Sequence, residues 1–217
     1  MSSFDSEARA RQPMFNLPKG GVVPLVLAIC AVSGLQLLGP PWVDGLLVYA
    51  GGVATGGAAP PHQVFGPYAP LVLHVFLHGG LLHLGLNMAA LLAFGAPCAQ
   101  ALGGAVSFWA FFFVCAVGGG LGQIAFASPG PSIMVGASTA VSGLLVGAAY
   151  VMRGARGRLA SPFDPGLWSF LAPWVVINLG LGLFGGQFGG QSIAWAAHLG
   201  GMATGFVAFP LMARQRG

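Results

Sequence analysis

Residues 135–143 read Val-Gly-Ala-Ser-Thr-Ala-Val-Ser-Gly, and the interpretation of the whole chain depends on this stretch. It places Ser138 shortly after a glycine, at the start of an expected short helix of small residues. Serines in such apolar surroundings usually pack helices together, with the hydroxyl bonded back to a carbonyl. A chemical role for Ser138 therefore needs support from other segments.

The composition indicates a membrane protein. Charged residues make up 6% of the 217 residues and hydrophobic residues 56%, whereas a soluble domain has roughly 25% charged residues. Two long stretches, 45–152 and 165–213, contain no Asp, Glu, Lys or Arg. A soluble protein could not hydrate such a surface, so we expect an integral membrane protein that has the lipid bilayer as a partner.

The basic residues do not form the aromatic-interleaved patch of a nucleic-acid-binding protein. They fall into three short clusters beside apolar segments, as determinants of membrane topology do: Arg9, Arg11 and Lys19; Arg153, Arg156 and Arg158; Arg214 and Arg216. The three cysteines lie singly in apolar segments, and we infer neither a disulfide nor a metal site from them.

Six apolar segments predict six membrane-spanning helices, at about 22–38, 80–102, 105–126, 137–152, 165–184 and 193–212. Six spans place all the basic residues on one side, which the positive-inside rule makes cytosolic. The prediction is a multi-pass protein of the cell membrane with both termini in the cytosol. Its parts are a cytosolic tail (1–20), a membrane domain (21–212) and a second cytosolic tail (213–217), with residues 39–75 as a loop partly in the membrane interface.

The fourth predicted span is short. Its roughly 16 residues extend about 24 Å, less than the ~30 Å hydrocarbon core of a bilayer. A short helix in the centre of a bundle starts below the outer membrane surface, under a dip that water can enter. Ser138 stands at that start.

Two other spans carry polar residues to a similar depth below the same face. His83 and Asn87 are four residues apart near the start of the second span and share one helix face. His198 lies near the second turn of the sixth span. A histidine in a membrane-embedded helix is costly to bury and by default marks a functional site with a partner.

These residue types support acyl transfer. A neutral His198 could accept the proton of Ser138 and make it a nucleophile. His83, Asn87 and the free N–H groups at the start of the fourth helix could stabilise the oxyanion. No carboxylate is expected near His198, since Asp44 is in the loop and Asp164 is on the cytosolic side, so the sequence predicts a dyad. Two small-residue pairs, Gly143/Gly147 and Gly201/Gly205, would let spans four and six approach closely.

Taken together, the motifs resemble the rhomboid family of intramembrane serine proteases. They are His-x4-His-x3-Asn at 78–87, Gly-x-Ser at 136–138 and Ala-His-x-x-Gly-x-x-x-Gly at 197–205. The resemblance implies an all-α, six-transmembrane-helix bundle with a short central fourth helix and a water-filled cavity open to the outside. It implies Ser138 as nucleophile, His198 as base, and His83, Asn87 and the Ser138 N–H as the oxyanion site, with His78 near the cavity mouth.

The chain departs from the family pattern beside the nucleophile. The usual Gly-x-Ser-Gly reads Gly-Ala-Ser-Thr, and the aromatic often found four residues after the serine is Ser142. The loop after the first span also lacks the frequent Trp-Arg pair. These departures bear on substrate range and rate, and the direction of the Thr139 side chain decides whether the first one affects the cavity.

The predicted function is therefore a serine endopeptidase that cleaves transmembrane protein substrates near the non-cytosolic membrane face, without cofactor or metal. The alternatives are an inactive rhomboid-like protein that holds or escorts membrane proteins, and a transporter or haem protein using His83 and His198. His62 has no expected role. His74 and His78 are four apart, but no third metal ligand is spaced with them.

Overall fold

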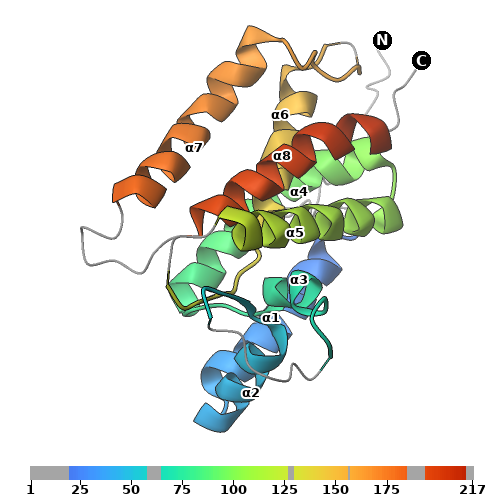
Figure 1. Cartoon of the computed structure of the whole chain (residues 1–217). Coiled ribbons are helices and arrows are strands. Elements are labelled where there is room, and N and C mark those ends of the chain that lie inside the picture. Colours follow the sequence, from blue (N-terminus) through green and yellow to red (C-terminus); the bar gives the residue numbers. More distant parts are fainter. Residues whose placement is uncertain (1–19, 58–64, 127–129, 156, 185–193, 214–217) are drawn as a thin grey trace, which may run out of the picture.

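The computed structural model describes residues 20–57, 65–126, 130–155, 157–184 and 194–213. Helices dominate, and one lies in each of the six apolar segments (Figure 1). They are α1 (Val22–Leu38), α4 (Leu81–Leu102), α5 (Ala105–Phe126), α6 (Ser138–Arg153), α7 (Pro165–Phe184) and α8 (Trp195–Met212). The predicted tails, except Gly20 and Ala213, lie outside the described residues, as do His62 and the first residue of the sixth predicted span.

The segment between α1 and α4, predicted as an interface loop, contains ordered elements. These are α2 (Pro41–Gly51), the strand β1 (Val53–Thr55), the single turn α3 (Pro70–Leu73) and the 3-10 helix η1 (His74–Phe76). Proline at the first position of α2 has the φ that a helix start requires. β1 pairs antiparallel with β2 (Ser132–Met134), just before the stretch that contains Ser138. Strands of three residues are too short for an alternating pattern, so the sequence did not predict this pairing.

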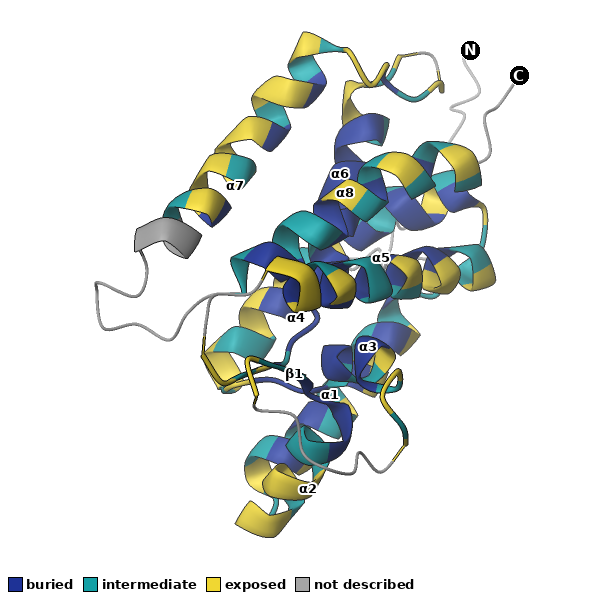
Figure 2. Cartoon of the chain, viewed as in Figure 1, coloured by how far each residue is buried: buried dark blue, intermediate teal, exposed yellow. Residues whose placement is uncertain are grey.

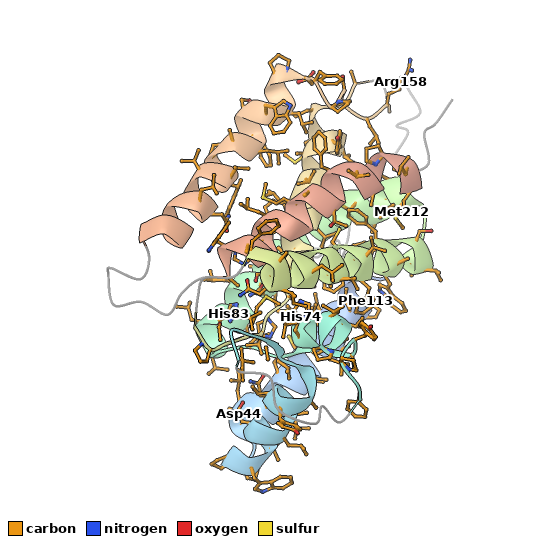
Figure 3. The ribbon with its side chains drawn as sticks, viewed as in Figure 1. Asp44, His74, His83, Phe113, Arg158 and Met212 are labelled. Carbon is orange, nitrogen blue, oxygen red and sulfur yellow. The ribbon has the colours of Figure 1, made fainter. Side chains whose placement is uncertain are left out.

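Two of the described helices, α4 and α5, are long and apolar enough to cross a membrane by length and composition, and α1 is apolar but shorter. The number of membrane crossings and the orientation of the termini stay predictions. Figure 3 shows Asp44 and Arg158 near opposite ends of the molecule.

The core is built around α6, in which 11 of the 16 residues are buried. Figure 2 shows this helix almost wholly buried, whereas much of α7 is exposed. α6 packs on α8, α4 and α5, and α5 packs closely on α8. The start of α6, with Ser138, therefore lies where several helices meet.

Glycine lets α6 and α8 approach each other at backbone distance. A Cβ atom added to Gly205 would lie 2.7 Å from the Cα of Gly143, closer than real side-chain contacts. Gly201 likewise faces the backbone of Thr139. The predicted close packing of these helices is confirmed at these positions, although Gly147 faces Phe209 and Cys98.

Candidate active site

Ser138 and His198 meet where α6 and α8 begin. Ser138 is the first residue of α6, and His198 lies in the first turns of α8. The serine Oγ and the histidine Nε2 are 2.8 Å apart, a hydrogen-bond distance. Both side chains are half-buried, so the pair is neither sealed in the core nor fully exposed.

His83 lies beside this pair, in a space that Gly136 leaves open. Gly136 has φ +126, and a Cβ atom there would lie 2.8 Å from His83 Cε1 and 3.6 Å from Ser138 Oγ. His83 Nδ1 accepts a hydrogen bond from the Gly79 N–H at 3.2 Å. Because a neutral imidazole has one donor and one acceptor nitrogen, the proton of His83 sits on Nε2, on the side of Gly136.

Asn87 lies one turn below His83 and is buried. Its Nδ2 donates to the His83 carbonyl oxygen at 2.9 Å, within the same helix. An amide nitrogen carries two hydrogens, so this bond leaves a second one for another acceptor. The predicted shared face of these two residues is present in α4.

The Thr139 side chain points away from the Ser138–His198 pair. Its hydroxyl is 2.9 Å from His74 Nε2, and its Cβ packs against Gly119 of α5. His74 Nδ1 contacts the Pro70 carbonyl oxygen at 2.8 Å and must donate there, so Nε2 accepts the threonine hydrogen. Thr139, which replaces the usual glycine, thus joins α6 to η1 through this hydrogen bond.

His74 also supports the backbone of the turn that precedes Ser138. Its carbonyl oxygen accepts the Gly136 N–H at 2.9 Å. No role was predicted for His74, and no sequence pattern links it to a threonine 65 residues away. Figure 3 shows His74 and His83 in the same part of the molecule, below α5.

His78 is fully buried, whereas the resemblance implied a position near a cavity mouth. Ser33 Oγ donates to the Phe76 carbonyl oxygen, so His78 Nδ1 donates to Ser33 Oγ at 2.8 Å. His78 Nε2 then accepts the Ala137 N–H at 3.4 Å. The rings of His74 and His78 thus have different partners, and the described part of the chain holds no group of three or more potential metal ligands.

Ser142, which stands where an aromatic is usual, bonds to its own helix. Its Oγ donates to the Ser138 carbonyl oxygen at 2.7 Å, one turn earlier. Ser142 therefore lies against the backbone of Ser138.

The structure adds one residue that the sequence analysis missed, Asn178 of α7. Its Oδ1 is 2.6 Å from His198 Nδ1, on the ring edge away from Ser138. The available signal was a lone asparagine in an apolar helix, whose amide oxygen can accept from an imidazole as a carboxylate does.

A family model described as the Rhomboid domain matches residues 66–215. The chain belongs to the rhomboid family. The match begins before α3 and extends past α8, so it includes Ser138, His198, His83, Asn87 and Asn178, while α1 and α2 lie outside it. A comparison with curated proteins found no matching sequence. A rhomboid domain with helices as apolar as α4 and α5 indicates a membrane protein.

Proposed function

We propose that this rhomboid is an intramembrane serine endopeptidase with Ser138 as nucleophile and His198 as general base. The observation that supports this most directly is the 2.8 Å separation between Ser138 Oγ and His198 Nε2. A base within hydrogen-bond reach of a hydroxyl is the arrangement that activates serine.

In the proposed reaction, Ser138 Oγ attacks the carbonyl carbon of the scissile bond as His198 Nε2 takes its proton. The resulting imidazolium donates that proton to the leaving amine nitrogen, which frees one product and leaves an acyl-enzyme. Water then attacks the ester in the same way and releases the second product.

The oxyanion site of the proposal consists of His83 Nε2–H, Asn87 and the first N–H groups of α6. The first four N–H groups of a helix have no intrahelical acceptor and are available to an anion. The position of His83 beside Gly136 and Ser138 supports its share in this site. Donors already in place when charge develops contribute more than donors that must reorient.

The proposed substrates are transmembrane proteins, cut near the non-cytosolic face by a protein that crosses the cell membrane six times with cytosolic termini. A helix hides its backbone carbonyls in its own hydrogen bonds. A substrate helix must therefore unwind locally before a carbonyl can reach Ser138, which favours segments with small or helix-breaking residues.

A fluorophosphonate probe tests the proposal. Wild-type protein in detergent should label at Ser138, while Ser138→Ala and His198→Ala should lose both labelling and cleavage of a model transmembrane substrate. Ser142→Ala is the matched control, because it removes another serine hydroxyl one turn away and should label normally.

Undiminished cleavage by Ser138→Ala or His198→Ala would exclude the dyad. If wild-type protein neither labels nor cleaves where an active rhomboid does both, the chain belongs among the inactive relatives that hold membrane proteins.

A further inference from the structure

Asn178 is the polar residue on the inward face of α7. Leu167, Leu171 and Asn178 are buried, and their spacing places them along one side of the helix. The neighbouring Ile177 and Leu179 are exposed. An asparagine in such surroundings needs hydrogen-bond partners to offset its burial.

The orientation of the Asn178 amide is fixed by its two partners. Its Nδ2 donates to the Trp174 carbonyl oxygen at 2.8 Å, and its Oδ1 faces His198 Nδ1 at 2.6 Å. The reversed amide would place Oδ1 against the Trp174 carbonyl oxygen, and two acceptors cannot form a hydrogen bond with each other. The hydrogen-bond network therefore selects the orientation with oxygen toward the histidine.

This orientation selects one tautomer of His198. An amide oxygen only accepts, so His198 Nδ1 must carry the proton and Nε2 must carry the lone pair. Nε2 is the atom that faces Ser138 Oγ. The selected tautomer is thus the one able to accept the serine proton, and the other tautomer would present an N–H to the hydroxyl.

We infer that Asn178 is a positioning residue that holds His198 in the tautomer and ring orientation needed for proton transfer from Ser138. This inference rests on the proposed protease function for its catalytic consequence, although the tautomer itself does not. A neutral amide performs the task without burying a carboxylate in an apolar region, which would be costly. Ser138, His198 and Asn178 come from three helices, α6, α8 and α7.

The test compares Asn178→Leu, which keeps the size and removes the acceptor, with Asn178→Asp, which keeps an acceptor oxygen. Ser169→Ala is the control on the same helix, since Ser169 Oγ donates within that helix, to the Gly166 carbonyl oxygen at 2.9 Å. The first measurement is the 15N NMR spectrum of histidine-labelled protein, with His198 assigned from the His198→Gln variant. The second is kcat and KM for a transmembrane substrate.

In wild type and Ser169→Ala, His198 should be the Nδ1–H tautomer. In Asn178→Leu the Nε2–H tautomer should appear, and kcat should fall between about tenfold and a hundredfold at nearly constant KM. Asn178→Asp keeps an oxygen toward His198 Nδ1 and should retain the wild-type tautomer and a higher kcat than Asn178→Leu, although its second oxygen faces the Trp174 carbonyl oxygen and should lower stability.

A wild-type tautomer in Asn178→Leu would overturn the inference, whatever the activity. Equal loss of kcat in the leucine and aspartate variants with the tautomer unchanged would also overturn it, by showing that Asn178 only packs. The NMR spectrum is recorded without substrate. If the protein never cleaves, the proposed function is wrong, but the tautomer of His198 in Asn178→Leu still decides whether Asn178 positions the ring.

Discussion

Replacing Thr139 with valine removes one hydroxyl from a site with no access to water. Thr139 is 1% exposed and His74 is 0% exposed, and their hydrogen bond is 2.9 Å long. Valine has almost the same shape, so packing against Gly119 persists, while His74 Nε2 becomes a buried acceptor without a donor. An unsatisfied buried group of this kind costs about 1–3 kcal/mol, so we expect Thr139→Val to lower the free energy of unfolding by about 2 kcal/mol.

Thr139→Gly, which restores the usual family residue, should be less stable still. It also removes the contact of the threonine Cβ with Gly119, and glycine within a helix costs about 1 kcal/mol more than alanine. The expected total loss is about 3 kcal/mol. Because the Thr139 side chain points away from Ser138, folded protein of either variant should react with a fluorophosphonate within about threefold of the wild-type rate.

The assay is unfolding by SDS in mixed micelles, followed by circular dichroism, with probe labelling measured on the folded fraction. Thr204→Val is the matched control, because the Thr204 hydroxyl donates to the Gly200 carbonyl oxygen of its own helix. A double variant with His74→Leu should show a coupling of about 1–2 kcal/mol between the two positions. If Thr139→Val is as stable as wild type, the hydrogen bond to His74 does not contribute as argued. If Thr139→Gly is as stable as wild type and reacts faster with the fluorophosphonate, the Thr139 side chain does affect Ser138.

Three further predictions concern residues around Ser138. Gly136→Ala should reduce cleavage by at least about a hundredfold, measured with a transmembrane substrate, because its Cβ would displace the His83 ring and φ +126 strains alanine; near-normal activity would contradict the placement of His83. Ser142→Ala should change the free energy of unfolding by less than about 1 kcal/mol, because the Ser138 carbonyl it releases can still accept within the helix; a larger loss in SDS unfolding would show a further role. Burial lowers the pKa of His74, which lies outside the predicted spans, from 6.5 to about 4. The unfolded state therefore binds a proton below pH 6.5 while folded His74 stays neutral, so the free energy of unfolding should fall as the pH is lowered from 6.5 toward 4. The loss at pH 5 should be about 2 kcal/mol, and it should be absent in His74→Gln measured over the same range.

The helix positions could be predicted because charge-free apolar segments are long and their ends carry glycine, proline or basic residues. Ser138, His198 and His83 could be proposed as neighbours because each lies near the start of a segment expected at the same membrane face. The structure brings these three together, while the part of Asn87 in an oxyanion site stays a proposal.

The contacts that support the site could not be predicted in this way. His74 and Thr139 are 65 residues apart, and each is a single polar residue without a repeating pattern. Asn178 could not be predicted as the partner of His198, because it is a lone asparagine in an apolar helix and no spacing links it to His198, although its amide oxygen fixes the same tautomer as a carboxylate. The β1–β2 pairing joins strands of three residues, too short for any alternation of polar and apolar residues to show.

The turn that carries Ser138 is held from a distant part of the chain. β1, the His74 carbonyl and ring, and His78 contact residues 132–139, and all of these partners precede α4. A chain divided between α5 and β2 would thus leave Ser138, Asn178 and His198 together on the second fragment and every one of these supports on the first. Under the proposed function, co-expression of two such fragments would give a conditional protease, in which the fragment bearing Ser138, Asn178 and His198 depends on reassembly with a fragment that bears none of the three.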